Sequence, residues 1–139
     1  MEISVNAGQA CATYKRGDVL LSTFPNLSDP TGDLMKRRPA LVIALLSLQT
    51  VLATFDYLIC MITSQNPPDP LLLPIHRSQI TSGLLTADQS CLRPCYLYGA
   101  SESIIIRKIA TLDIRLADEV ARRITALIGA SLGDKGNTP

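Results

Sequence analysis

Short apolar runs, separated by polar segments, make up most of this chain. Residues 17–24 form the first run, closed by Pro25, and two further apolar runs follow at 40–46 and 55–62. Their length and their content of β-branched residues are typical of buried strands. Because a polar turn near 47–50 separates the last two runs, we expect them to pair as neighbours in one sheet.

Loop-forming segments lie between these runs and further strand candidates. Residues 26–36 are rich in Ser, Asp, Pro and Gly, which predicts a loop. Four of the nine prolines fall within 67–74, which excludes a central strand or a helix interior there but permits a short edge strand at 71–73. A Ser82-Gly83 turn and a polar stretch precede the last strand candidates, residues 91–98 and 103–109.

The end of the chain changes from strand spacing to helical spacing. A helix is predicted from Asp113, a suitable N-cap, to Gly129, a suitable stop. Its apolar positions are Leu116, Val120, Ile124, Leu127 and Ile128. On its solvent face, i,i+4 ion pairs are expected between Asp118 and Arg122 and between Glu119 and Arg123.

Several short strands followed by one helix predict a mainly β (α+β) fold, a small barrel with a C-terminal helix packed on it. A chain of 139 residues is long enough for one domain with its own core. We place that domain at 14–130, between a loose N-terminal leader at 1–13 and a frayed tail at 131–139.

The amino-acid composition excludes several classes of protein. Hydrophobic residues make up 47% of the chain, which excludes disorder over its whole length. A net charge of +1 excludes a protein that coats duplex DNA, although a local basic patch remains compatible with it. No apolar stretch reaches the roughly 18 residues of a membrane span, and the N-terminus lacks a signal-peptide pattern. A cytoplasmic protein is therefore expected, and its apolar excess predicts an oligomer.

The cysteines and the single histidine do not suggest a metal site. Without an export signal, the four cysteines are expected to be reduced and mostly buried. Cys91 and Cys95 are close in sequence, but zinc sites usually need a second close pair of ligands, and His76 is alone. No metal and no cofactor are predicted.

Polar groups at the ends of the predicted strands are the candidates for chemistry. The first candidate is Lys36-Arg37-Arg38-Pro39, where the proline fixes its own φ and favours an extended backbone at Arg38. A guanidinium held in this way is suited to binding two oxygens of a phosphate. The alternative is that these residues are only a solvated basic segment before the strand. After the run at 55–62, the hydroxyls of Thr63 and Ser64 could donate to phosphate, with Gln65 beside them, or merely cap the strand end.

A second arginine precedes a proline at Arg93-Pro94, which suggests another directed cation near a strand. His76-Arg77 follows Pro74 and adds charge that could reach the same face. A lone histidine is, however, more often a hydrogen-bonded surface residue than a catalyst.

The order of these segments resembles the MazF/PemK family of toxin endoribonucleases from type II toxin–antitoxin modules. The resemblance covers roughly 14–128. The segments that carry it are Lys15-Arg16-Gly17-Asp18-Val19, Lys36-Arg37-Arg38-Pro39-Ala40-Leu41-Val42, Met61-Ile62-Thr63-Ser64, Ser82-Gly83-Leu84-Leu85 and Leu92-Arg93-Pro94.

The resemblance implies a compact SH3-like β-barrel with a C-terminal helix, assembled as a homodimer. It also implies metal-independent cleavage of single-stranded RNA, in which the ribose 2′-OH attacks the adjacent phosphate and leaves a 2′,3′-cyclic phosphate. Catalytic roles are expected for Arg38, Thr63 and Arg93. RNA-binding roles are expected for Lys36, Arg37, Ser64, Gln65, His76 and Arg77. A cognate antitoxin, a partly disordered acidic segment over the Arg38 face, would be the inhibitor.

Three differences from the family pattern leave a second function open. The PemK-like branch has an acidic residue two positions after the second arginine, where this chain has Cys95; the polar loop has no histidine; and there is no tryptophan to stack on bases. The alternative is a CcdB-like toxin that binds DNA gyrase, or a binding module on the same barrel with weakened catalysis.

Overall fold

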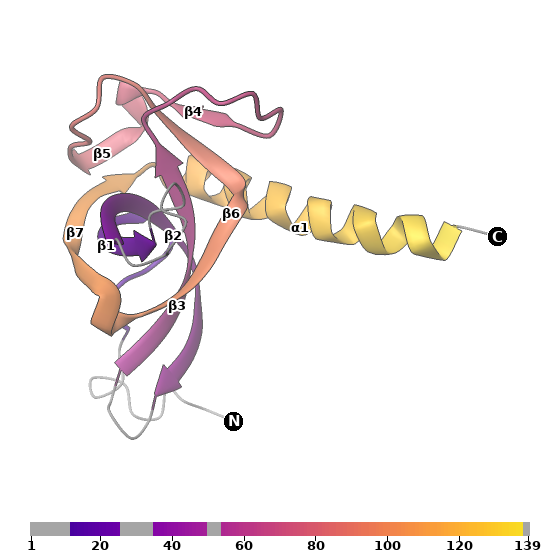
Figure 1. Ribbon diagram of the computed structural model, residues 1–139, viewed down its shortest axis with the longest axis horizontal. Coiled ribbons are helices and arrows are strands. Elements are labelled where there is room, and N and C mark those ends of the chain that lie inside the picture. The colour runs from indigo at the N-terminus through magenta and orange to yellow at the C-terminus, as the bar shows by residue number, and fades with distance from the viewer. Residues whose placement is uncertain (1–11, 26–34, 50–53, 138–139) are drawn as a thin grey trace.

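The computed structural model describes residues 12–25, 35–49 and 54–137 (Figure 1). Among them, seven strands form one antiparallel sheet in the order β4-β6-β3-β2-β1-β7-β5. The strands are β1 (Asp18–Pro25), β2 (Met35–Gln49), β3 (Thr54–Thr63), β4 (Leu73–Ile75), β5 (Ile80–Gly83), β6 (Ser90–Ser101) and β7 (Ile105–Leu112). Two 3-10 turns, η2 (Arg77–Gln79) and η3 (Glu102–Ile104), precede β5 and β7, and α1 (Ile114–Asn137) ends the fold.

The sheet curls into a half-barrel with the helix at one side, which confirms the predicted mainly β fold with a C-terminal helix (Figure 1). The two long apolar runs pair as β2 and β3, in a register that includes Leu41–Cys60 and Val42–Ile59. The structure extends β2 in both directions. It begins at Met35, so the predicted loop was too long at its C-terminal end, and it continues through 47–49, where a turn was expected.

Smaller differences occur at the edges of the sheet. The proline-rich segment does contain an edge strand, but it is β4 at Leu73–Ile75 rather than 71–73. Strand β5 was not predicted, because Ser82-Gly83 reads as a turn. Gly83 ends β5 with φ +69°, and a Cβ there would collide with the carbonyl oxygen of Ile109 in the paired strand β7. Only glycine allows this close approach of the two backbones.

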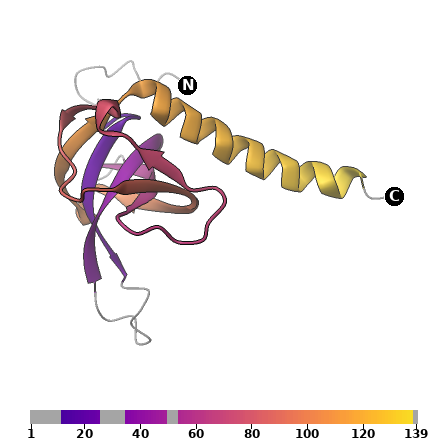
Figure 2. The same cartoon turned by 90° about the horizontal axis from the view of Figure 1, so that it is seen from above.

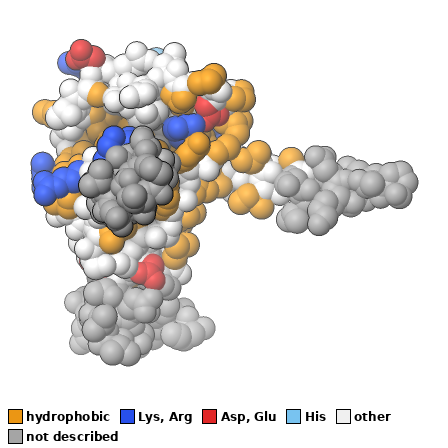
Figure 3. Space-filling view, in the orientation of Figure 1, with side chains coloured by type: hydrophobic (Ala, Val, Ile, Leu, Met, Phe, Trp, Pro, Cys, Tyr) orange, Lys and Arg blue, Asp and Glu red, His pale blue; other side chains and the backbone are white. Residues whose placement is uncertain are grey.

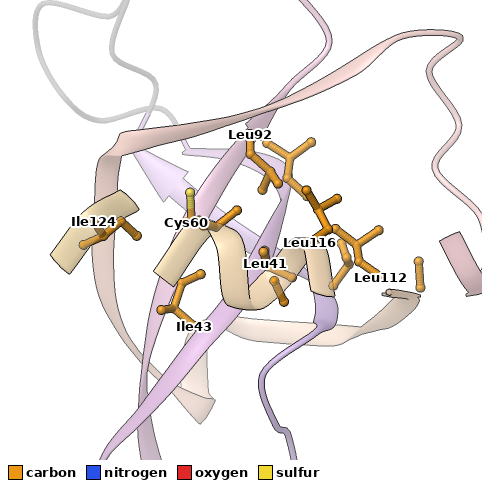
Figure 4. Packing of buried hydrophobic residues seen from close by; sticks show 12 residues of the cluster. Leu41, Ile43, Cys60, Leu92, Leu112, Leu116 and Ile124 are labelled. Carbon is orange, nitrogen blue, oxygen red and sulfur yellow. The ribbon is translucent and has the colours of Figure 1, made fainter. Parts of the chain in front are cut away.

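The core has two parts, one on each face of the curled sheet. Leu41, Cys60 and Leu92 belong to the part that packs under the helix, together with Leu116 and Ile124 from the helix itself (Figure 4). The other part is centred on Phe24 and Tyr57, both almost fully buried. Alternation along β2 and β3 sends successive side chains to opposite parts, so the buried stretches at 40–43 and 59–62 are apolar without a break.

The Lys15-Arg16-Gly17-Asp18 segment fastens the helix to the sheet. Arg16 donates from Nε to the Ile43 carbonyl in β2 at 2.8 Å and forms an ion pair with Asp118 of α1 at 3.0 Å. Asp18 accepts from the Lys15 backbone N–H at 3.0 Å and pairs with Lys108 of β7 at 3.1 Å. This part of the family resemblance is therefore structural, because it joins β1, β2, β7 and α1.

The helix begins as predicted but ends later. Asp113 Oδ1 accepts the backbone N–H of Arg115 at 2.9 Å, an N-cap contact, and the Arg115 side chain lowers the pKa of Asp113 to about 2. The predicted stop at Gly129 is wrong: the helix continues to Asn137, through most of the predicted frayed tail. Figures 1 and 2 show the C-terminal half of α1 extending away from the barrel.

One of the two ion pairs expected on the helix is present, and the other is not. Glu119 pairs with Arg123 at 2.9 Å, but Asp118 is taken by Arg16, and Arg122 pairs with Glu119 at 2.8 Å instead. The long-range pair with Arg16 could not be predicted from helical spacing.

The predicted leader lies almost wholly outside the described residues. No helix of the described chain has the length and apolar character to cross a bilayer.

Candidate functional site

The Lys36–Pro39 segment lies where β2 has only one neighbouring strand. It pairs with β1, placing Arg38 opposite Ser22 and Pro39 opposite Leu21, whereas the β2–β3 ladder starts at the Ala40–Met61 pair. Pro39 therefore loses no hydrogen bond to β3 through its missing N–H. Two residues beyond the Ala40–Met61 pair on each strand are Arg38 and Thr63, so both lie at the same end of the ladder.

A cleft of about 700 Å³ opens at this end of the sheet. Lys36, Arg37 and Arg38 line it from β2, and Ser64 and Gln65 line it from the segment after β3. Its remaining walls are mainly aliphatic and include residues 84–87. We call it the cationic cleft. The structure thus brings together five of the nine residues that the sequence suggested for the site.

Arg107 also lines the cationic cleft, and sequence reasoning missed it. It lies in β7 opposite Leu21 of β1, and Leu21 is in turn opposite Pro39 of β2, so one row across three strands carries Arg107 to the basic segment. A signal was present in the sequence, because Arg107-Lys108 places two cations in a strand that is otherwise mainly apolar.

The cationic cleft has no compensating negative charge among the described residues. No carboxylate and no imidazole lines it there, and none of its four cations, Lys36, Arg37, Arg38 and Arg107, forms an ion pair with a described carboxylate. Figure 3 shows blue Lys and Arg side chains in groups at the centre and the left edge of the barrel. Like charges gathered in a partly enclosed site focus a field that attracts anions.

Thr63 supports the cleft from behind rather than lining it. It is buried at 6% exposure, and its Oγ1 accepts the backbone N–H of Gln65 at 3.1 Å. This hydrogen bond fixes the turn that presents Ser64 and Gln65 to the cleft. The structure therefore gives Thr63 a positioning contact and places its two neighbours at the surface of the site.

Arg93 is separated from this group. Its Nε lies 3.5 Å from Oδ2 of Asp69, and its guanidinium carbon lies 3.8 Å from the centroid of the Tyr96 ring. The side chains of Arg93 and Asp69 are only 20% and 11% exposed. An acid and an aromatic face thus already contact this guanidinium, and it does not line the cationic cleft.

The cysteines near Arg93 differ in exposure. Cys60 and Cys91 are buried, as expected, whereas Cys95 is an exposed free thiol. Burial raises the pKa of the Cys60 thiol to about 12, and its Sγ donates to the Arg93 carbonyl at 3.3 Å. Cys11 lies outside the described residues. Within the described chain, no group of three or more His, Cys, Asp or Glu side chains is arranged to hold a metal ion.

Neither His76 nor Arg77 lines the cationic cleft. The His76 backbone N–H donates to Gln79 Oε1 at 2.8 Å, so His76 begins the η2 turn, and it lines neither cleft. Arg77 lines a second cleft of about 370 Å³ that shares residues 84–87 and Ser90 with the first. The two predicted neighbours in sequence therefore have different surroundings.

Comparison with protein families agrees with this architecture. The family model of PemK-like, MazF-like toxins of type II toxin–antitoxin systems matches residues 15–128, most of the chain. The chain belongs to this family. The match confirms the resemblance drawn from the sequence, and membership implies an antitoxin as the partner of this toxin. A search of curated proteins found no match.

Proposed function

We propose that this toxin is a metal-independent endoribonuclease that cleaves single-stranded RNA. The observation that carries the proposal is the cationic cleft, where four cations meet without a described carboxylate at the end of the β2–β3 ladder. Family membership supports a toxin role, and a phosphodiester backbone is a polyanion that such a cleft attracts.

The proposed reaction is a transesterification within the RNA strand. Hydroxide takes the proton of the ribose 2′-OH as the 2′-oxygen attacks the adjacent phosphorus. The bond from phosphorus to the 5′-oxygen breaks, this oxygen takes a proton from water, and the products carry a 2′,3′-cyclic phosphate and a 5′-hydroxyl. Charge builds up on the non-bridging oxygens in the transition state. Arg38 binds these oxygens through its guanidinium, with Lys36, Arg37 and Arg107 holding the flanking phosphates.

Catalysis in this scheme is mainly electrostatic. No described residue that lines the cleft is an acid or a histidine, so its side chains offer hydroxyls, an amide and cations but no strong base. General acid–base catalysis typically contributes about 10²- to 10⁴-fold, so we expect a slow enzyme whose rate rises with hydroxide concentration. Ser64 and Gln65 donate hydrogen bonds that orient the strand.

The antitoxin partner fits the same surface. An acidic segment laid over Lys36, Arg37 and Arg38 would pair with cations that have no described carboxylate partner, and it would exclude RNA by occupying the cleft.

We also propose a homodimer, supported by exposed apolar side chains on β2 and on the C-terminal half of α1: Leu45, Leu46, Leu127 and Ile128. A monomer in sedimentation at micromolar concentration would contradict the dimer.

The test is cleavage of a mixed-sequence single-stranded RNA in the presence of EDTA, with analysis of the new ends. We expect fragments that end in a 2′,3′-cyclic phosphate. Intact RNA under all conditions would contradict the proposal, and 3′-phosphate or 3′-hydroxyl ends formed at once would contradict the mechanism. Inhibition of gyrase supercoiling without RNA cleavage would favour the CcdB-like alternative.

A further inference from the structure

The second cleft differs from the cationic cleft in its charge. Among the described residues, Ile75, Arg77, Ile80 and Asp88 line it, so its described lining holds one cation and one carboxylate, whereas that of the cationic cleft holds four cations and no carboxylate. Its volume of about 370 Å³ is within the roughly 300–1,000 Å³ typical of small-molecule sites. We call it the side cleft.

The two charges of the side cleft do not neutralise each other. Arg77 and Asp88 form no ion pair together, and the described residues give neither side chain another ion-pair or hydrogen-bond partner. An open donor and an open acceptor in one cleft suit a ligand that is polar but neutral overall. A second phosphate would instead meet the Asp88 carboxylate, so the side cleft is a poor site for the RNA backbone.

The two clefts are next to each other. Residues 84–87 and Ser90 line both, so these side chains form a wall with one cleft on each side. A strand whose phosphate lies in the cationic cleft can therefore place an adjoining base in the side cleft. Aliphatic side chains and a guanidinium face are surfaces on which a flat base packs in proteins that read single-stranded RNA.

The Asp88 carboxylate selects among the bases by the hydrogen bonds it can accept. An ionised carboxylate has two acceptor oxygens and no donor. Guanine offers two adjacent donors, N1–H and the 2-amino group, whereas adenine and cytosine each offer one amino donor beside ring acceptors and uracil has one N–H between two carbonyls. Guanine is therefore the base that can satisfy both oxygens of Asp88 at once.

We propose that the side cleft is a nucleobase subsite that binds guanine, with its Watson–Crick edge on Asp88 and its face against Arg77. This inference rests on the proposed RNA cleavage, because the scissile phosphate in the cationic cleft fixes which base enters. It assigns Asp88 and Arg77 to sequence selection and leaves phosphate binding to the neighbouring cleft.

Cut-site mapping on a long mixed-sequence RNA tests the subsite. Wild type should show a guanine preference at one fixed position beside the cut, and Asp88→Asn should reduce it by about tenfold, the discrimination of one good bidentate contact. Replacing that guanine with inosine, which lacks the 2-amino group, should lower kcat/KM, whereas 7-deazaguanine should leave it unchanged. Glu119→Gln, on the helix, is the matched control and should keep the wild-type profile.

A binding measurement separates this inference from the proposed function. Single-stranded DNA has no 2′-OH to attack, so wild type should bind a dG-containing oligomer several-fold more tightly than its deoxyinosine counterpart without cutting it, and Asp88→Asn should remove that difference. Equal affinities would overturn the subsite, as would RNA cleavage with no guanine preference or with one that Asp88→Asn leaves intact. Absence of RNA cleavage alongside the dG preference would overturn only the proposed function.

Discussion

Two arginines of this toxin precede prolines near the starts of strands, yet they have opposite surroundings. Arg38 in β2 lines a cleft whose described residues include three further cations and no acid. Arg93 in β6 faces Asp69 at 3.5 Å and lies over the ring of Tyr96. The Arg-Pro dipeptide extends the backbone in both places, but it does not determine what the guanidinium meets.

The difference shows what makes a cation available for an anionic ligand. A guanidinium that already has a carboxylate and an aromatic face gains little from a phosphate, because it must first give up those contacts. A guanidinium among like charges gains more, because the ligand also relieves their mutual repulsion. Arg38 is therefore expected to control activity, and Arg93 to control stability.

The largest effect is expected from Arg38→Ala. Loss of the guanidinium should lower the rate of RNA cleavage by about 100- to 1,000-fold, the usual consequence of removing one group that stabilises transition-state charge. Single-turnover cleavage in EDTA measures it. Arg38→Lys should recover only part of the rate, since an ammonium cannot bind two phosphate oxygens in the same plane.

A matched control separates charge from position. Arg122→Ala removes an arginine from the exposed face of α1, where Glu119 is its one ion-pair partner among the described residues, and should leave cleavage at the wild-type rate. Cleavage by Arg38→Ala at the wild-type rate would remove Arg38 from the mechanism and break the contrast with Arg93.

The next effect is on stability and comes from Arg93→Ala. The change leaves the Asp69 carboxylate, 11% exposed, without its cation and should lower the free energy of unfolding by about 1–3 kcal/mol. Urea unfolding followed by circular dichroism measures it. RNA cleavage under folding conditions should change little. The double variant Asp69→Ala with Arg93→Ala should be more stable than the sum of the single changes predicts, and strict additivity would argue against the pair.

The strands could be predicted because their evidence is local. The apolar runs at 40–46 and 55–62 became β2 and β3, and the family order of segments located the basic end of β2. Strand β5 could not be predicted, since Gly83 at φ +69° is favoured by its fit against Ile109, which is distant in sequence. The late end of α1 was missed for a related reason, because one glycine lowers helix propensity by only about 1 kcal/mol.

The candidate site was predictable only where it consists of consecutive residues. Lys36, Arg37 and Arg38 follow one another along β2, so the sequence shows that they are neighbours, although alternation along a strand does not explain why all three line one cleft. Arg107 reaches this group through the pairing of β7 with β1. Arg93 instead contacts Asp69, which the proline-rich segment brings close to it. A local pattern cannot show either event, since both depend on contacts between distant parts of the chain.

A smaller effect is expected from Arg107→Ala. If Arg107 contacts one phosphate, its loss should weaken RNA binding several-fold and reduce the slope of log affinity against log salt by about 0.7, the value for one contact to a single strand. Fluorescence anisotropy over a salt series measures the slope. Lys108→Ala is the neighbouring control, because Lys108 is already paired with Asp18, and its slope should stay at the wild-type value. A reduced slope for Lys108→Ala would place Lys108 at the RNA instead.

The smallest effect is expected from Cys95→Asp, which introduces an acid at the position where the resemblance to the PemK-like branch leads one to expect it. Cys95 is exposed and lines neither cleft, and the nearby Arg93 already has Asp69 beside it. The new carboxylate should change cleavage by no more than about fivefold, the equivalent of the roughly 1 kcal/mol of an exposed ion pair. Cys95→Ser is the uncharged control. A much faster Cys95→Asp enzyme, with Cys95→Ser unchanged, would place a proton acceptor beside the scissile bond and move the reaction toward Arg93. The two arginines would then share one site, and the separation between Arg38 as the catalytic arginine and Arg93 as the structural one would fail.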